Sequence, residues 1–350
     1  MHPLAELWTW FADTSCAGYS PLYDSISRAV AASPEMIELI SEAPPSGHQP
    51  TVLLASVHYL LLDGLDHPLA AVYAGTSDAD AGPLFVDVCL RNRSRVVELL
   101  ATRHTNTNEV GRSAVLGPAL TTVAGELGSP LGLVDVGCSA GLNLLCDKYL
   151  LDYGRAGSTG PPDAAVRISC EVVGGQPPIA STLPAIAARV GIDRDPVDAT
   201  DDDDVRWQLA CVWPDTGRLP RTRLALEEAK RTSLQLVRGD AVETVTEVVL
   251  GLPADVVPVV TTTWAVAYFS KPERVAFREA LAAASRGRPV AWISGESVGV
   301  IDLFAHVEAP PGAQGLEPSV LGLVVFRDGA PDARHLALVH PHGTWIDWRA

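Results

Sequence analysis

The spacing of apolar residues differs between two parts of the chain. In the first part the apolar positions recur at helical spacing, so that Leu54, Val57 and Leu61 share one face of a predicted helix. In the second part short apolar runs alternate with helix-like stretches, which is typical of βαβ units and a mostly parallel sheet. The sequence therefore predicts a mainly helical domain over residues 1–128 and an α/β domain over residues 129–350.

The α/β part is predicted to hold a series of strands and a closing hairpin. The candidate strands are Leu131–Val136, Val166–Val172, Val190–Asp193, Leu234–Val237, Val256–Val260 and Pro289–Ser294. The turn-rich segment Asp328–Asp332 separates Leu321–Arg327 from His335–His340, and this arrangement predicts an antiparallel hairpin. A helix is predicted directly after the first strand, over Leu142–Tyr153.

Charge and apolar run length narrow the expected partners. The 350 residues carry 26 Lys and Arg against 42 Asp and Glu, a formal net charge of −16 that opposes binding to nucleic acid or an anionic membrane. The longest apolar-rich run, Thr51–Leu62, is shorter than the ~20 residues of a membrane helix, and the N-terminus lacks a secretory signal pattern. We therefore expect a cytoplasmic protein with no nucleic-acid or membrane partner, and its oligomeric state stays open.

No metal site is predicted. The six cysteines form no CxxC pair and have no histidine at zinc-ligand spacing, so we expect them to be reduced and mostly buried. The four acids of Asp201–Asp204 cannot all face one ion, and they are expected to begin a helix, where acids suit the macrodipole. His340 and His342, separated by one proline, are expected to be structural.

A glycine-rich turn is the most informative segment of the sequence. The strand that begins at Leu131 runs into Gly137-Cys-Ser-Ala-Gly141, and helix-like residues follow. Glycines at such a turn let the backbone approach a ligand, and the first amides of a helix attract negative charge. The turn is not the dinucleotide GxGxxG fingerprint, because Ser139 and Leu142 take the second and third glycine positions.

Three interpretations of this turn are open. Ser139 fits the nucleophile elbow of an α/β-type serine hydrolase, with several acids and His335, His340 and His342 later in the chain. Asp135-Val-Gly137 with Gly141 instead resembles the first motif of S-adenosylmethionine-dependent methyltransferases. The third interpretation is a plain glycine-rich turn of another α/β domain. Strand order favours the methyltransferase, because the residues before Leu131 are predicted as helices and the hydrolase elbow follows several strands.

Later segments resemble the remaining methyltransferase motifs. Asp193 of Gly-Ile-Asp193 is the preferred acid for the ribose hydroxyls, although it lies 56 residues beyond Gly137 where ~20 is usual, and Glu171 is the alternative. Asp240 and Ala241 resemble the motif that meets the adenine. The predicted cofactor-binding residues at these motifs are Asp135, Gly137, Ser139, Gly141, Asn143, Glu171, Asp193, Asp240 and Ala241.

The segment Thr102–Arg112 carries many hydrogen-bonding side chains between two helical stretches. It is either a capping and turn network or part of a ligand site. In a ligand site, Arg103 or Arg112 would pair with the cofactor carboxylate, and Glu109 or His104 would act as the general base. The predicted substrate pocket consists of Asn106, Asn108, Thr263, Trp264 and Glu296.

Four longer strings resemble a known family. They are Ala101–Arg112, Val134–Leu145, Arg189–Asp198 and Arg206–Pro214. With them the chain resembles the bacterial domain-of-unknown-function family 2332, whose members are described at most as methyltransferase-like. The resemblance covers most of the chain and leaves the reaction unassigned.

The leading hypothesis combines these features. We expect a helical cap or substrate domain and a Rossmann-like, seven-stranded methyltransferase-type sheet that binds S-adenosylmethionine and a small-molecule methyl acceptor. The enzyme alternative is a serine hydrolase built on Ser139. The non-enzymatic alternative is a methyltransferase-like binding module that has lost its chemistry.

Overall fold

The first part of the chain, where apolar residues recur at helical spacing, forms a series of short helices. Proline stands at the first position of several of them, where its missing N–H costs nothing. The Ser20 and Ser33 side chains cap two helices by accepting from the amides of Tyr23 and Met36. The helices are α1 (Pro3–Phe11), α2 (Pro21–Ala32), α3 (Pro34–Ser41), α4 (Pro50–Leu62), α5 (Leu69–Tyr73), α6 (Ala81–Arg91) and α7 (Arg93–Thr102).

Helix α4 forms the centre of this helical region. Residues 52–60 are all buried, in agreement with a sequence that is apolar on every side. Helix α9 (Asp202–Ala210) packs against α4, and its Trp207 is only 4% exposed. The Asp201 side chain accepts from the amides of Asp203 and Asp204, which confirms that the acidic run begins a helix.

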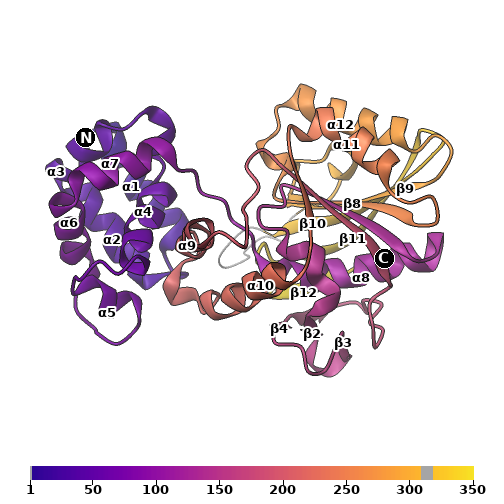
Figure 1. Cartoon of the computed structure of the whole chain (residues 1–350), viewed down its shortest axis with the longest axis horizontal. Coiled ribbons are helices and arrows are strands. Elements are labelled where there is room, and N and C mark those ends of the chain that lie inside the picture. The colour runs from indigo at the N-terminus through magenta and orange to yellow at the C-terminus, as the bar shows by residue number, and fades with distance from the viewer. Residues whose placement is uncertain (1, 309–317) are drawn as a thin grey trace. The chain divides into compact units, whose positions relative to one another are not determined.

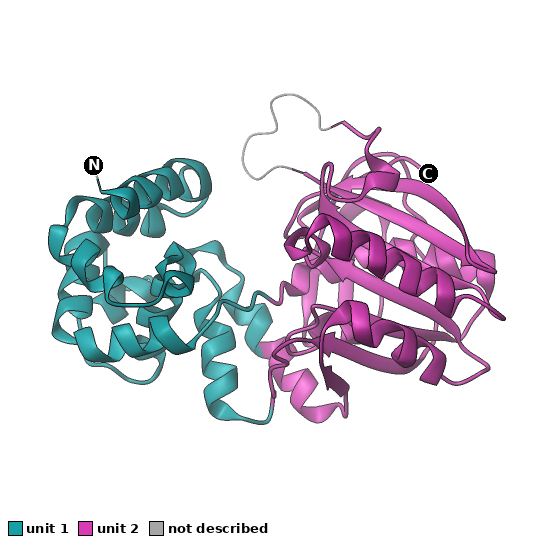
Figure 2. Cartoon of the chain, turned by 90° about the horizontal axis from the view of Figure 1, so that it is seen from above, with its two compact units in different colours: residues 1–107, 200–223 teal, residues 108–199, 224–350 magenta. Residues whose placement is uncertain are grey.

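The computed structural model describes residues 2–308 and 318–350, and the chain divides into two units (Figure 2). Unit 1 consists of residues 1–107 and 200–223, and unit 2 of residues 108–199 and 224–350. The sequence predicts a division at residue 128, whereas α8 (Ser113–Leu127) lies in unit 2. Of the described helices, none is long and apolar enough to cross a membrane.

Unit 2 contains a nine-stranded mixed sheet, so the chain is an α/β protein with an N-terminal helical region. Five of the eight neighbouring pairs are parallel, and the antiparallel pairs are β9 with β10, β10 with β11 and β11 with β12. The order is β5 (Glu171–Gly174), β12 (Trp345–Trp348), β11 (Ala330–Val339), β10 (Ser319–Arg327), β9 (Val290–Ser297), β8 (Val257–Thr263), β1 (Leu131–Val136), β6 (Ile186–Asp193), β7 (Gln235–Arg238).

The sheet is larger than the seven strands expected from the sequence. The predicted strand Val166–Val172 is wrong as one element, because its hydrogen-bond partners change partway along. The amide of Cys170 donates to Asp152, whereas the amide of Glu171 donates to Thr344. The first half therefore joins a small sheet of β3 (Ser158–Thr159), β2 (Leu150–Asp152) and β4 (Arg167–Ser169), and the second half becomes β5.

The helix predicted over Leu142–Tyr153 is also wrong. The chain forms a 3₁₀ helix, η4 (Leu142–Lys148), and then enters β2. Side chains take the carbonyls that an α-helix would use: the Tyr149 hydroxyl donates to Leu142 at 2.7 Å and Arg189 donates to Leu144 at 2.8 Å. These bonds replace the i to i+4 pattern and keep the segment short.

Helices cover both faces of the sheet. Helices α11 (Ala241–Gly251) and α12 (Lys271–Ala284) lie on one face and α8 on the other (Figure 1). The core under α11 and α12 includes Val134, Val260, Phe277, Trp292 and Val324. Helix α10 (Leu219–Arg231) follows α9 in the connection from β6 to β7. The short turns are η1 (Ala12–Cys16), η2 (Pro45–His48), η3 (Val110–Arg112), η5 (Gly154–Ala156), η6 (Pro214–Thr216), η7 (Val266–Tyr268) and η8 (Asp302–Phe304).

The closing hairpin was predicted correctly. Strands β10 and β11 pair antiparallel from Ser319 with Val339 to Arg327 with Ala330. Because β10 is antiparallel to both β9 and β11, β11 runs in the direction of β9. The carboxyl ends of β1, β6, β8, β9 and β11 therefore lie along one edge of the sheet, which we call the carboxyl edge.

Candidate functional site

The strand order places a topological switch at the carboxyl edge. The first strand of the sheet, β1, has β6 and then β7 on one side and β8 and then β9 on the other. This is the order 3-2-1-4-5 of doubly wound sheets, which bind ligands outside the carboxyl ends of the strands where the order reverses. The candidate site is therefore the set of residues that follow β1, β6, β8 and β9.

The glycine-rich turn leaves β1 at this switch with an unusual backbone. Gly137, Ser139 and Gly141 have φ values of 73°, 51° and 72°, in the left-handed region that favours glycine. A Cβ atom on Gly137 would lie 2.9 Å from the Cβ of Ala265, so this position requires glycine. Gly137 is exposed, whereas residues 138–143 are buried. A ligand can therefore approach the turn from the side of Gly137.

The burial of Ser139 bears on the hydrolase alternative. Its side chain is fully buried, although its backbone is strained in the left-handed region. A nucleophile elbow has the strained backbone too, but it exposes its serine to the substrate. The geometry of Ser139 therefore does not favour a catalytic nucleophile.

Asp193 meets the glycine-rich turn from the neighbouring strand. Its Oδ2 accepts from the amide of Ser139 at 2.8 Å, and its Oδ1 accepts from the amide of Asp195 at 2.9 Å. A carboxylate has about four acceptor sites, so each oxygen keeps capacity for one more donor. Asp193 is half-buried at the end of β6, as a carboxylate that reaches a ligand at the carboxyl edge must be.

Asn108 holds the two ends of the same turn. Its Nδ2 donates to the carbonyl of Cys138 and its Oδ1 accepts from the amide of Leu142, both at 2.9 Å. Asn143 is held in a similar way, since its Oδ1 accepts from the hydroxyl of Ser113 at 3.0 Å. Both asparagines are buried. The contacts of Asn108 fix the backbone of the turn, and its expected place in a substrate pocket stays a prediction.

Asp135 lies beneath the turn, inside the sheet. Its carboxyl is 2% exposed and accepts from the hydroxyl of Thr261 on β8 at 2.6 Å. Burial raises the pKa of Asp135 to about 7, while the Thr261 hydrogen bond and the charge of Arg112 oppose the shift. Asp135 therefore carries a proton through much of the range below neutral pH.

Glu296 organises the loop that follows β8. It is 1% exposed, and its carboxylate accepts from the amides of Ala265, Val266 and Ala267 at 3.1–3.2 Å. Burial raises the pKa of Glu296 to about 7 against these three hydrogen bonds. The carboxylate thus fixes the first turn of η7, and Tyr268 at its end is 83% exposed.

Trp264 enters this loop in a strained conformation. Its φ is 57°, and its Nε1 donates to the Ser319 hydroxyl at 2.9 Å. Thr263, the last residue of β8, and Trp264, which follows it, are both half-buried. Backbone strain such as that of Trp264 recurs at functional sites, and the substrate pocket expected at these two residues stays a prediction.

Arg112 connects two loops of the carboxyl edge. Its Nε donates to the carbonyl of Pro341 at 3.0 Å and its Nη1 donates to the carbonyl of Thr263 at 2.9 Å. Burial lowers the pKa of Arg112, while the charges of Glu109 and Glu296 oppose the shift. Arg112 was predicted to pair with a cofactor carboxylate. Such a pairing would compete with its two hydrogen bonds to the carbonyls of Pro341 and Thr263.

Three other predicted residues belong to unit 1. The guanidinium of Arg103 pairs with the carboxylate of Asp203 and lies 5.4 Å from the ring centre of Trp207. The carbonyl of His104 accepts from Nε1 of Trp207, and that of Asn106 accepts from Gln208. All these partners are in unit 1, so the segment predicted as one site is divided between two units at residue 107.

The remaining predicted residues lie elsewhere on unit 2. Glu171 begins β5, at the end of the sheet opposite β7, so the structure does not bring it to the glycine-rich turn. Asp240 follows β7 at the carboxyl edge and caps α11 through the amide of Val242. Its carboxylate also pairs with exposed Arg194 at 2.7 Å, and Ala241 is buried as the first residue of α11. Asp240 and Ala241 thus stand two strands away from β1.

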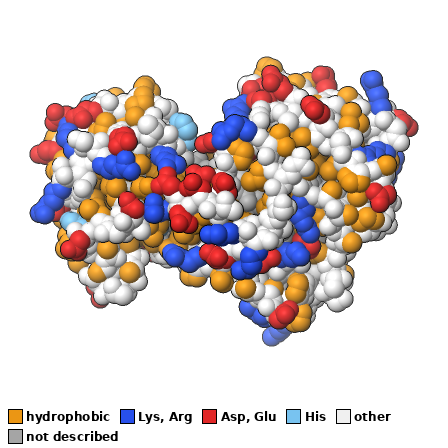
Figure 3. All heavy atoms as spheres, viewed as in Figure 1, with side chains coloured by type: hydrophobic (Ala, Val, Ile, Leu, Met, Phe, Trp, Pro, Cys, Tyr) orange, Lys and Arg blue, Asp and Glu red, His pale blue; other side chains and the backbone are white. Residues whose placement is uncertain are grey.

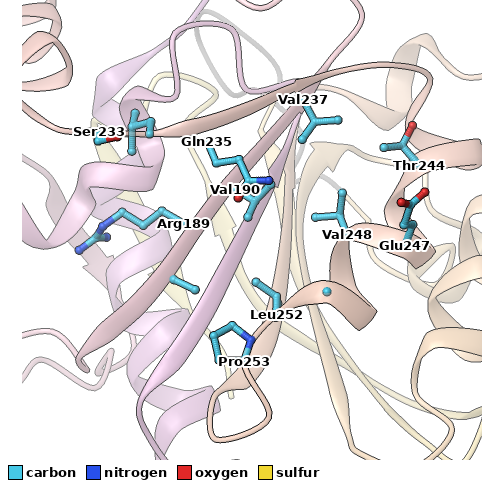
Figure 4. Close-up of a pocket in the computed structure, with 13 residues that line it drawn as sticks. Arg189, Val190, Ser233, Gln235, Val237, Thr244, Glu247, Val248, Leu252 and Pro253 are labelled. Carbon is cyan, nitrogen blue, oxygen red and sulfur yellow. The ribbon is translucent and has the colours of Figure 1, made fainter.

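A surface cavity of about 660 Å³ lies away from these residues (Figure 4). Strands β6 and β7 line one side, and α11 with the residues that follow it lines the other. The cavity includes Ala188 and Gln235, near the amino ends of the two strands, and Pro253. It is therefore distinct from the carboxyl edge.

One feature of the site was not expected. The turn after β11, with His340 and His342, reaches the carboxyl edge, and Nδ1 of His342 lies 3.4 Å from Oε2 of Glu109. The sequence predicts that these histidines are structural, and the direction of β11 places them at the carboxyl edge. The direction of β11 follows from the antiparallel hairpin that comes after the fifth parallel strand. The predicted order of strands could therefore have placed the two histidines at this edge.

The fold and the carboxyl edge define the class of protein: an α/β protein with an N-terminal helical region and a mixed, mostly parallel sheet. The chain belongs to the family DUF2332, described as an uncharacterized protein conserved in bacteria, which matches residues 5–348. The comparison with curated proteins gives no match. This membership confirms the resemblance to the family that was drawn from the sequence; it assigns no reaction, and the likeness to methyltransferases stays a prediction.

Proposed function

We propose that the protein is an S-adenosylmethionine-dependent methyltransferase that acts on a small molecule. The observation that carries the proposal is the contact of Asp193, at the end of β6, with the glycine-rich turn that leaves the neighbouring strand β1 beside the switch in strand order. A nucleoside bound there would pass its ribose over exposed Gly137 and hydrogen-bond to Asp193.

The residues present fit this cofactor by shape and charge. Gly137 offers backbone without a side chain, and Asp193 keeps acceptor capacity for ribose hydroxyls. Asp193 and Glu109 are acids near the same edge, and Arg112 is a cation near Glu109. An acidic surrounding suits a sulfonium cation better than an anionic phosphate.

When bound, S-adenosylmethionine supplies an electrophilic methyl group. The chain itself has to orient the acceptor and exclude water, because in-line methyl transfer gains mainly from positioning. Thr263, the last residue of β8, and Trp264, which follows it, would contact the acceptor. Glu296 would keep their loop rigid through its three amide contacts.

Calorimetric titration of the full chain with S-adenosylmethionine and S-adenosylhomocysteine tests the proposal. We expect both to bind, and Asp193→Ala to weaken binding at least 10-fold because the ribose loses its acceptor. Asp195→Asn is the matched control, since the Asp195 side chain is 78% exposed and pairs with Arg238. Absence of binding to the wild-type chain overturns the proposed function.

Burial of residues 138–143 favours one further candidate, a binding module without chemistry. Such a module would bind S-adenosylhomocysteine as tightly as an enzyme does. It would transfer no tritium from S-adenosyl-[methyl-³H]methionine to any acceptor, including a metabolite extract of bacterial cells. Transfer that depends on Asp193 distinguishes the enzyme from the module.

A further inference from the structure

The turn after β11 is fixed against the segment that precedes α8. The amide of Gly343 donates to the carbonyl of His340 at 2.8 Å, and Gly343 has a φ of 70°. A Cβ atom on Gly343 would lie 2.0 Å from the carbonyl oxygen of Gly111. The two backbones therefore touch, and glycine at position 343 permits the contact.

This contact brings Glu109 beside His342. Oε1 of Glu109 accepts from the amide of Gly111 at 2.9 Å, and Oε2 lies 3.4 Å from Nδ1 of His342. The Glu109 side chain is 2% exposed and that of His342 is 16% exposed. A carboxylate at Nδ1 favours the tautomer with its proton on Nδ1, so proton exchange with a ligand falls to Nε2.

The neighbouring histidine supports the geometry. Nδ1 of His340 accepts from the amide of His342 at 3.0 Å, which fixes the backbone on which His342 is carried. The two rings are 5.6 Å apart between centres, and His340 also contacts the ring of Trp345 at 6.2 Å. The side chain of His342 is therefore paired with Glu109, and the backbone amide of His342 is bound by His340.

Arg112 places this pair beside the candidate site. Its guanidinium joins the carbonyl of Pro341, next to His342, to the carbonyl of Thr263 at the end of β8. The loop after β8 also presents Tyr268, which is almost wholly exposed. An imidazole, a guanidinium and an exposed aromatic ring thus lie on loops of the carboxyl edge.

We propose that Glu109 and His342 form the proton-accepting dyad of this site, and that the methyl acceptor is a phenol-type hydroxyl compound. The inference rests on the proposed function. In the step, the acceptor oxygen forms a bond to the methyl carbon and the sulfur–methyl bond breaks, with its electron pair going to sulfur. The hydroxyl proton passes to Nε2 of His342, while Glu109 stabilises the imidazolium through Nδ1–H.

The basicity of an imidazole selects the acceptor class. Imidazole titrates near pH ~6.5 and a phenol near pH ~10 in model compounds, so proton transfer between them is within reach of a catalytic dyad. An alkyl hydroxyl holds its proton about as tightly as water and is a much poorer match. Tyr268 and half-buried Trp264 offer rings on which an aromatic acceptor can stack.

The first experiment reads the dyad without any turnover. In full chain labelled with ¹⁵N-histidine, the Nδ1 and Nε2 shifts of His342 report its tautomer and its titration midpoint. We expect Glu109→Gln to shift the tautomer of His342 and lower its midpoint, because the ion-pair partner of the imidazolium is lost. His335→Gln, on β11, is the control and leaves the His342 signals unchanged. Unchanged His342 signals in Glu109→Gln overturn the dyad.

The second experiment measures transfer from S-adenosyl-[methyl-³H]methionine to a panel of phenols, with their methyl ethers and primary alcohols as comparisons. We expect methylated phenols from the wild type, a loss of about 10²-fold or more in kcat for His342→Gln, and partial recovery of His342→Ala by added imidazole. S-Adenosylhomocysteine should bind wild type and His342→Gln within threefold of each other.

The outcomes separate this inference from the proposed function. Failure of the wild type to bind S-adenosylhomocysteine overturns the proposed function and the catalytic role of the dyad, while the histidine spectra still establish whether the pair exists. Binding without transfer to any phenol overturns the acceptor class. Transfer that His342→Gln and Glu109→Gln retain within threefold overturns the dyad as the proton acceptor.

Discussion

Single residues in this protein hold backbone segments in conformations that the sequence around them does not favour. Asn108 closes the glycine-rich turn, and Glu296 gathers three amides behind the strained Trp264. Both residues were predicted to line a substrate pocket, Glu296 from its position in the chain alone. Their burial shows why sequence alone could not separate the two roles, since a polar residue at a ligand edge serves either the ligand or the backbone.

Asn108→Ala tests the role of Asn108. The substitution leaves the carbonyl of Cys138 and the amide of Leu142 buried without a partner, so we expect a loss of about 2–4 kcal/mol in the free energy of unfolding. Urea denaturation measures it. Asn143→Ala is the control, because Asn143 bonds a hydroxyl that can rotate to another acceptor, and its loss should be smaller. Equal losses in the two variants would contradict the assignment.

Asp135 predicts a pH dependence of stability. Its folded pKa of about 7 is raised by burial above the ordinary value of 3.8, so the folded chain keeps a proton that the unfolded chain loses. Stability from this group is fully present below pH ~4 and is lost as the pH rises to ~7, by at most about 1.4 kcal/mol per pH unit.

Urea denaturation at pH 5, 6 and 7 checks this sign. The wild type should lose more stability across the series than Asp135→Asn, which cannot titrate there. Burial raises the pKa of Glu296 to about 7 as well, so Glu296 contributes the same pH dependence of stability to both proteins. Exposed Asp255→Asn should follow the wild type. A wild type and Asp135→Asn with parallel pH profiles would show that Asp135 is ionised in the folded state.

At the scale of elements, prediction succeeded where one physical signal dominated. Strand β1 and the hairpin of β10 and β11 were found from apolar runs and turn residues. Element α11 was not predicted, and the helix after the glycine-rich turn became η4 because Tyr149 and Arg189 take its carbonyls. The Arg189 bond joins residues 45 positions apart, and no local sequence pattern predicts it. The same reason hid the pairing of His342 with Glu109, which depends on the direction of β11.

At the scale of the whole molecule, the chain leaves unit 1 and returns to it. Residues 200–223 belong to unit 1, and this segment contributes Trp207, Ala210 and Cys211 to the apolar core of that unit. His58 Nδ1 lies 3.1 Å from the carbonyl of Ala210, and burial lowers the pKa of His58 to about 4. The division at residue 128 was predicted from the order of helices and strands along the chain. That order does not show that a later segment packs into an earlier unit.

The return predicts that residues 1–107 do not fold by themselves. Without α9 the apolar surface that receives Trp207 is exposed, and loss of a buried tryptophan alone costs about 3–5 kcal/mol, a large share of the stability of a small domain. Residues 1–107 joined by a flexible linker to 200–223 should instead show dispersed amide signals and cooperative urea unfolding, because Gln208 again meets the carbonyl of Asn106. The same unfolding midpoint for the two chains would show that α9 adds nothing to the core of unit 1.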